Sequence, residues 1–166
     1  MVTGVYPRER VVEELPGWVF ERDRFTALIN EQSGVIARWQ ALQFLTRKAI
    51  EHRIATRRWR PAHRGVYLTY GGPITLAQRH WVAVLAGSSG PSVMESGNPC
   101  LAGLSALQVH GLDRVTSPRI DVLVPAARRL LAPAGVVVHR SVEMDRHPTS
   151  RPPTTAIGRA VVDAAA

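Results

Sequence analysis

The sequence predicts an α+β fold in which a basic helical segment, closed by a β-hairpin, precedes a small α/β unit. Apolar residues recur with helical spacing over residues 24–58, which indicates amphipathic helices. Two short strand-like runs then flank Gly65, and Gly71-Gly72-Pro73 breaks the chain soon afterwards. Beyond that break, helical and strand-like patterns follow one another. We therefore expect a domain boundary at the break.

The expected organisation has three parts. Residues 1–21 contain several prolines and glycines and little periodicity, which is typical of a loosely docked arm. Residues 22–71 form the first domain and residues 72–166 the second. A length of 166 residues accommodates one ordinary domain or two small ones. A chain of this size buries a core without the help of disulfides.

The first helix of the 22–71 domain is predicted from Arg24 onwards. Phe25, Leu28 and Ile29 stand at positions i, i+3 and i+4 and make one apolar face. Ser33-Gly34 follows that face and is expected to end the helix, because glycine is the usual residue after a helix terminus.

Two more helices are expected before the hairpin. A short one covers residues 38–43, with Ala41 and Leu42 facing inward. Thr46 then stands at an N-cap position, where its hydroxyl accepts a hydrogen bond from a free backbone N–H. The helix that it caps covers residues 47–58.

A β-hairpin is predicted over residues 59–68, with its turn at His63–Gly65, because Gly65 tolerates a positive φ. Three helices followed by a hairpin are the element order of a winged helix-turn-helix. This is the fold that we expect for residues 22–71.

The 72–166 segment is expected to be a small α/β domain. The pattern predicts helices over residues 75–86, 101–109 and 154–166. It predicts strands over residues 119–124 and 136–140, and a loop rich in Gly, Ser and Pro over residues 88–99.

Composition excludes several classes of protein. Apolar residues make up 45% and charged residues 20%, as in a globular protein and unlike a disordered one. Cys100 is the only cysteine, so no disulfide scaffold forms within the chain. No run approaches the ~18 apolar residues of a membrane span, and the first residues are too charged for a signal peptide. We expect a cytoplasmic protein without membrane attachment.

The positive charge is concentrated in one segment. Of a net charge of +8, residues 37–64 carry +7, because eight basic residues stand there against Glu51 alone. A GC-rich genome accounts for 20 arginines against one lysine, but it does not account for this clustering. Clustered positive charge favours a polyanionic partner, most often nucleic acid.

The predicted helix 47–58 has two distinct sides. At 100° per residue, Ile50 and Ile54 form a buried stripe, and Lys48, His52 and Thr56 lie opposite them. A thin polar edge flanked by arginines fits a major groove about 12 Å wide, with the edge toward the bases and the arginines toward the phosphates. We therefore interpret this helix as a recognition helix for double-stranded DNA.

The predicted DNA contacts combine this helix with its flanks and with the hairpin. They are Arg38, Arg47, Lys48, His52, Arg53, Thr56, Arg57, Arg58, Arg60, His63 and Arg64. Glu51 is expected to pair with Arg47 or Arg58, or to accept from a cytosine amino group. Trp39, Trp59 and Tyr67 have the spacing of an apolar face, which favours core packing over stacking on bases. The alternative for the whole segment is a solvated basic helix that keeps the protein soluble.

Several short motifs recur in an order that resembles a known family. In the first domain they are Gly34-Val35-Ile36, Gln40-Ala41-Leu42, Thr46 to Ile50, Arg58-Trp59-Arg60 and His63 to Tyr67. In the second they are Gln78-Arg79 with Trp81, Ser105-Ala106, His110-Gly111-Leu112, Ile120 to Pro125, Arg128-Arg129, Val138 to Ser141, and Arg159 with Val162-Asp163. Together these motifs resemble the AbiEi-type antitoxins over residues 24–166. The N-terminal module of that family also heads many actinobacterial proteins that carry a restriction-endonuclease-like domain.

The resemblance implies a DNA-binding antitoxin that represses its own operon in a type IV toxin–antitoxin system. A nucleotidyltransferase-like toxin would then be the partner gene product, and the second domain would be the part linked to the antitoxin role. A lone winged helix covers few base pairs, so a homodimer or tandem binding is a reasonable expectation. A further alternative is a protein-binding module whose surface is merely basic. Such a module would show no salt-dependent affinity for DNA.

An alternative is the DNA-targeting part of a nuclease whose catalytic domain lies outside this chain. The final helix ends abruptly, which fits either a truncated domain or one that needs a partner surface. The downstream DNA discriminates between the two hypotheses. An in-frame Asp and Glu-x-Lys set favours the nuclease, and an adjacent toxin gene favours the antitoxin.

No enzyme activity, cofactor or metal site is expected in the chain itself. A nuclease core of that class holds Mg²⁺ with an Asp and a Glu/Asp-x-Lys pair, whereas Lys48 is the only lysine and has no carboxylate two residues earlier. The six histidines and Cys100 lack zinc-ligand spacing. We expect His80 at the core or its rim and Cys100 as a small buried residue. Gly71-Gly72 has no P-loop lysine after it.

Overall fold

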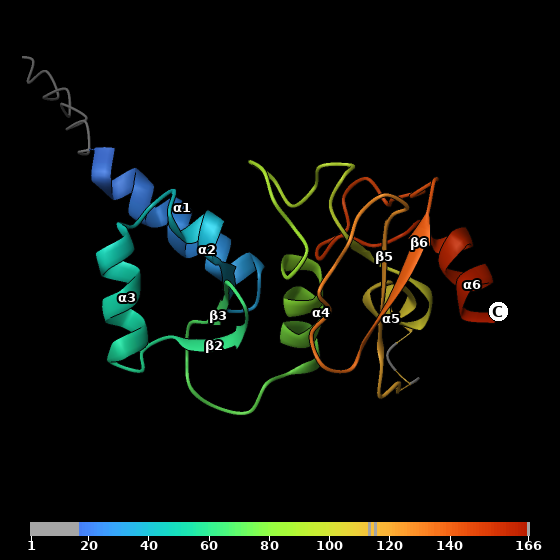
Figure 1. Cartoon of the computed structure of the whole chain (residues 1–166), viewed down its shortest axis with the longest axis horizontal. Coiled ribbons are helices and arrows are strands. Elements are labelled where there is room, and N and C mark those ends of the chain that lie inside the picture. The colour runs from blue at the N-terminus through green and yellow to red at the C-terminus, as the bar shows by residue number, and fades with distance from the viewer. Residues whose placement is uncertain (1–16, 113, 115, 166) are drawn as a thin grey trace, which may run out of the picture.

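The computed structural model describes residues 17–112, 114 and 116–165, and it has an α+β fold with two three-stranded sheets (Figure 1). The first unit, at the left of Figure 1, contains α1 (Gly17–Glu31), β1 (Val35–Ala37), α2 (Arg38–Ala41), α3 (Arg47–Ala55), β2 (Arg60–His63) and β3 (Val66–Leu68). The second contains α4 (Leu76–Leu85), β4 (Cys100–Leu101), α5 (Gly103–Val109), β5 (Ile120–Pro125), β6 (Val136–Ser141) and α6 (Ile157–Ala165). No described helix is long and apolar enough to cross a membrane.

α1 begins earlier than the sequence pattern predicts. It starts at Gly17, the first described residue, and not at Arg24, so the end of the arm predicted over residues 1–21 is helical. Residues 1–16 of that arm lie outside the described residues. The predicted end of the helix is confirmed, because Ser33 and Gly34 adopt φ values of 55° and 81°. A Cβ atom on Gly34 would lie 2.8 Å from the ring of Tyr70, so glycine is required there.

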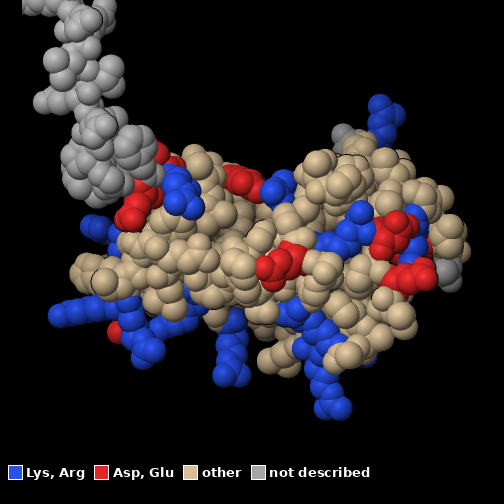
Figure 2. Space-filling view, turned by 90° about the horizontal axis from the view of Figure 1, so that it is seen from above, with Lys and Arg blue, Asp and Glu red and all other residues tan. Residues whose placement is uncertain are grey.

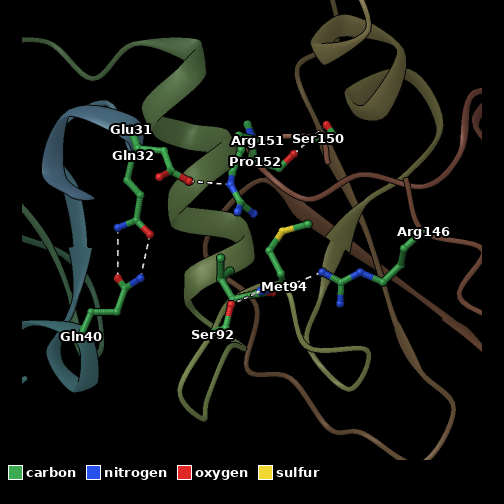
Figure 3. Close-up of polar contacts among 10 residues, drawn as sticks. Glu31, Gln32, Gln40, Ser92, Met94, Arg146, Ser150, Arg151 and Pro152 are labelled. Carbon is green, nitrogen blue, oxygen red and sulfur yellow. Dashed lines mark hydrogen bonds and ion pairs between the residues drawn. The ribbon is translucent and has the colours of Figure 1, made fainter. Parts of the chain in front are cut away.

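Two buried glutamines attach α2 to the end of α1 (Figure 3). The side-chain amides of Gln32 and Gln40 exchange two hydrogen bonds of 2.7 and 3.0 Å. Gln40 Oε1 also accepts a 3.0 Å bond from the backbone N–H of Ala37, which precedes α2 and has no capping side chain of its own. α2 ends at Ala41, and Leu42 is 47% exposed. The prediction that Leu42 faces inward is wrong, because the chain leaves the helix there to turn toward α3.

The first sheet is antiparallel throughout, with the order β1-β3-β2. The hairpin of β2 and β3 confirms the predicted one, and Gly65 in its turn has a φ of 72°. β1 is not predicted from the sequence, because its three residues are too few to show an alternating pattern and, unlike β3, it does not adjoin a hairpin turn. It pairs with β3 from Val35–Leu68 to Ala37–Val66.

Both faces of this sheet are buried. One face packs against α1 and α3 through a cluster of Ile36, Ala41, Ile50, Trp59 and Tyr67. The other face, with Val35, Ala37, Val66 and Leu68, joins α4 and the second sheet in the main core. That core contains residues from both sides of Gly71-Gly72-Pro73. The two units therefore share one core across the place where the sequence suggests a boundary.

The second sheet has the order β4-β5-β6, with β4 antiparallel and β6 parallel to β5. β5 and β6 confirm the two predicted strands. The predicted helix over residues 101–109 begins only at Gly103, because Leu101 belongs to β4 and pairs with Val122. The C-terminal helix likewise begins at Ile157 and not at Thr154.

Two arginines and an ion pair hold the loop over residues 88–99 and the segment before α6. Arg146 donates to the backbone carbonyls of Val93, Glu95 and Asn98, and Figure 3 shows it reaching the loop beside Met94. Arg128 donates to the carbonyl of Gly97, to Asn98 Oδ1 at 3.2 Å and to Ser89 Oγ at 3.0 Å. Arg151 pairs with Glu31 of α1 at 2.6 Å, which connects the two units (Figure 3).

Candidate nucleic-acid interface

α3 has the orientation that the sequence predicts. Thr46 caps the helix by accepting a 3.2 Å hydrogen bond from the N–H of Ala49. Ile50 is fully buried, whereas the side chains of Lys48 and His52 on the opposite side are exposed. The helix packs on the first unit by the isoleucine side and presents its polar side to solvent.

The C-terminal end of α3 is shorter than predicted. The helix ends at Ala55, and Arg57 adopts a φ of 56°, so the chain turns before the predicted end at residue 58. The hydroxyl of Thr56 donates to the carbonyl of His52 at 2.7 Å. Thr56 is exposed on the same side as His52, with its methyl group and the hydroxyl's lone pairs still free to contact a ligand.

Four exposed arginines near this helix have no partner among the described residues. Arg47, Arg57 and Arg58 flank it, and Arg64 occupies the turn of the hairpin. Within the part of the chain that the structure describes, none of these four guanidinium groups forms an ion pair or a side-chain hydrogen bond. Their charge is therefore not neutralised by described residues, and their N–H groups are available to an anion.

Three other predicted contacts already have partners in the protein. Arg53 donates to the carbonyl of Ala49 at 3.1 Å, and its guanidinium carbon lies 5.7 Å from the ring centroid of Trp59. Arg60 donates to the carbonyl of Gly72 at 2.9 Å from the outer strand of the sheet. These bonds leave part of each guanidinium group free, because arginine has five N–H donors.

Arg38 is the third. It donates to the hydroxyl of Tyr67 at 3.3 Å and lies 3.8 Å from the carboxylate of Glu51. The hydrogen bond to Tyr67 raises the pKa of Arg38 above its ordinary value. The expected pairing of Glu51 with Arg47 or Arg58 is wrong, because β3 and the start of α2 bring Arg38 close to that carboxylate. His63 is half-buried at the end of β2.

Figure 2 shows how these charges are distributed. Lys and Arg side chains project from one long edge of the molecule, both at the end that holds the first unit and beyond its middle. Most acidic side chains in that view lie away from this edge. Such segregation gives one side of the protein a positive potential that attracts a polyanion.

The aromatic residues near α3 belong to the core. Trp59 is 5% exposed and Tyr67 is 7% exposed, and their ring centroids lie 5.9 Å apart. Phe25 of α1 packs against Trp59 at 6.4 Å. The prediction of core packing is confirmed for Trp59 and Tyr67, and Trp39 is half-buried.

Two titratable side chains outside this region, His80 and Cys100, are buried, as predicted. His80 is 4% exposed, and burial lowers its pKa to about 4. Cys100 is fully buried, and burial raises the pKa of its thiol to about 11. Among the described residues, no group of three His, Cys, Asp or Glu side chains lies close enough to hold a metal ion.

Sequence reasoning missed basic residues of the second unit that lie beside the hairpin. Arg79 and Arg119 are 40 residues apart in the sequence, and the structure brings Arg79 to within 3.1 Å of the carbonyl of Pro118. The only sequence signal for Arg119 is its place as the first residue of the alternating strand predicted over residues 119–124. No family model matches this chain, and no curated protein matches it either.

Proposed function

We propose that this protein is a sequence-specific binder of double-stranded DNA in which residues 22–71 act as a winged helix-turn-helix. The observation that carries the proposal is α3, which buries Ile50 and exposes Lys48 and His52. Thr56 is exposed directly after the helix, and the flanking Arg47, Arg57 and Arg58 have no described partner. A helix of this shape fits the major groove of B-DNA. The element order α1-β1-α2-α3-β2-β3 supports the same interpretation.

Each exposed side chain has a natural partner on DNA. Lys48 donates to the O6 and N7 atoms of guanine, and His52 contacts base edges one turn further along. The flanking guanidinium groups of Arg47, Arg57 and Arg58 bind phosphates and fix the register of the helix. Arg64 in the hairpin turn follows the backbone or enters an adjacent minor groove. Arg53 braces the helix against Trp59.

The biological role that we propose is transcriptional regulation. Through its resemblance to AbiEi-type antitoxins, we propose that the chain represses an operon encoding itself and a nucleotidyltransferase-like toxin. The DNA site would then lie upstream of its own gene. Binding by two copies, as a homodimer or in tandem, would extend the number of base pairs that are recognised.

An electrophoretic mobility-shift titration tests the proposal. The probes are the duplex upstream of the gene and a shuffled duplex of the same length and composition. If about five phosphates are neutralised, log K falls against log[salt] with a slope of roughly −4 to −5. We expect tighter binding to the upstream duplex. An affinity that does not depend on salt, or that is equal for both probes, would contradict sequence-specific binding.

Single substitutions locate the interface. Lys48→Ala and His52→Ala should weaken binding to the upstream duplex more than binding to the shuffled one, because base contacts are lost. Arg60→Ala should weaken both to the same extent, because a phosphate contact is lost. Equal losses for all three variants would contradict the placement of α3 in the groove.

A further inference from the structure

The hairpin of the first unit lies directly against the second unit. Ala62 of β2 lines a cavity of about 210 Å³ together with Arg79 and Val82 of α4 and Ile120 of β5. β2 also carries Arg60, and the turn after it carries Arg64. The strand that would run along the DNA backbone therefore adjoins the start of β5, and the surface continues from one unit to the other.

An arginine of α4 contacts the chain just before β5 at this point. The guanidinium of Arg79 donates to the backbone carbonyl of Pro118 at 3.1 Å. This bond holds the residue directly before Arg119. Arg119 stands in the bend that directly precedes Ile120, the buried first residue of β5. Arg119 is exposed, and its side chain forms no hydrogen bond or ion pair with a described residue.

The described acidic residues of the second unit form no ion pair with this surface. Asp121 pairs with His139 at 2.9 Å, and Asp163 pairs with Arg159 at 2.8 Å. No described acid forms an ion pair with Arg79 or Arg119. The basic edge in Figure 2 extends past the middle of the molecule, which agrees with a positive surface shared by both units.

We propose that the DNA interface continues beyond the hairpin onto the second unit, where Arg119 contacts a phosphate of the flanking duplex. Arg79 acts as a positioning residue, because its bond to Pro118 fixes the backbone that carries Arg119. This inference rests on the proposed function. It predicts that one copy of the chain contacts a longer stretch of DNA than a winged helix-turn-helix alone.

Salt titrations of Arg119→Ala test the inference on the full chain. The probe is a duplex of arbitrary sequence of about 30 base pairs, or three helical turns. Losing one phosphate contact should reduce the magnitude of the salt slope by about 0.9. The matched control is Arg129→Ala, an exposed arginine that follows the far end of β5, a strand about 20 Å long. That variant should leave the slope unchanged.

Duplex length provides a second comparison. On a duplex of about 12 base pairs, just over one helical turn, only the first unit is engaged, so Arg119→Ala should bind like the parent. Arg79→Ala should reproduce the slope of Arg119→Ala on the longer duplex, and the double variant should show no further loss. An additive loss would overturn the positioning role, and thermal melting confirms that each variant is folded.

The outcomes separate this inference from the proposed function. If Arg60→Ala reduces the slope while Arg119→Ala and Arg129→Ala behave alike, the extension onto the second unit is wrong and the first unit still binds DNA. If the parent protein shows no salt-dependent binding to any duplex, the proposed function fails, and the inference fails with it.

Discussion

Two sets of arginines, one from each unit, differ in what they bind. Arg57, Arg58 and Arg64 contact no described partner, whereas Arg128 and Arg146 donate to carbonyl and side-chain oxygens of the loop over residues 88–99. The two sets have the same chemistry. Only donors that the fold has left unused are available to an external anion. The number of arginines therefore does not identify a binding surface. What identifies it is whether their N–H groups already donate hydrogen bonds within the protein.

The largest expected effect is on the free energy of unfolding, and it comes from removing an arginine whose guanidinium donates hydrogen bonds within the protein. Arg146→Ala deletes hydrogen bonds to three backbone carbonyls, of which those of Val93 and Asn98 lie at 3.2 and 2.9 Å. Because bonds to a charged donor are strong and buried carbonyls lose their partner, we expect a loss of about 3 to 4 kcal/mol in the free energy of unfolding. Urea denaturation measures it. DNA affinity at a temperature where the variant is folded should equal that of the parent, and a weakened affinity would contradict the comparison.

His80 differs from both sets of arginines, because it is a basic side chain that burial keeps neutral in the folded protein. Its pKa of about 4 lies below the unfolded value of 6.5 because of burial. The unfolded chain therefore binds the proton first, and stability falls as pH decreases from 6.5 to 4. The full loss for a shift of this size is about 3 kcal/mol. Denaturation of the parent and of His80→Gln across this range measures it. The same pH dependence in both proteins would contradict the assignment to His80.

Lys48→Ala tests an exposed cation that has no partner among the described residues. Lys48 is exposed and has no described partner, so its loss should change the free energy of unfolding by less than about 0.5 kcal/mol. Binding to the upstream duplex should weaken by about 1 to 3 kcal/mol, the usual value of one base contact. Fluorescence anisotropy measures the affinity and urea denaturation the stability. A large stability loss would show that Lys48 has a structural partner.

The smallest effect is expected for Arg58→Ala. This arginine is exposed and unpaired among the described residues, so the folded protein should be as stable as the parent. The salt slope for a shuffled duplex should decrease in magnitude by about 0.9, because one phosphate contact is lost. The control is Arg53→Ala, in α3 itself. It removes the contact with Trp59, worth about 0.5 to 1 kcal/mol, so it should lower stability where Arg58→Ala does not.

Much of the first unit could be predicted because its signals are local. The cap at Thr46, the opposite positions of Ile50 and Lys48, and the turn at Gly65 all depend on residues close in sequence. β1 and β4 were not predicted, because strands of three and two residues are too short for a pattern and neither adjoins a hairpin turn like the one at Gly65 that marks β3. The exposure of Leu42 depends on where α2 ends, and helix ends are the part of a pattern that is hardest to place.

The sequence by itself determined the α+β composition, the basic segment, and the orientation of α3, because periodicity and charge are properties of neighbouring residues. The tertiary structure alone decided which arginines remain available, since Arg146 finds its acceptors at residues 93, 95 and 98. It also decided that Arg79 meets Pro118 beside the hairpin. A guanidinium group is satisfied by whichever oxygens the fold brings within about 3 Å, and those oxygens belong to segments far away in the sequence.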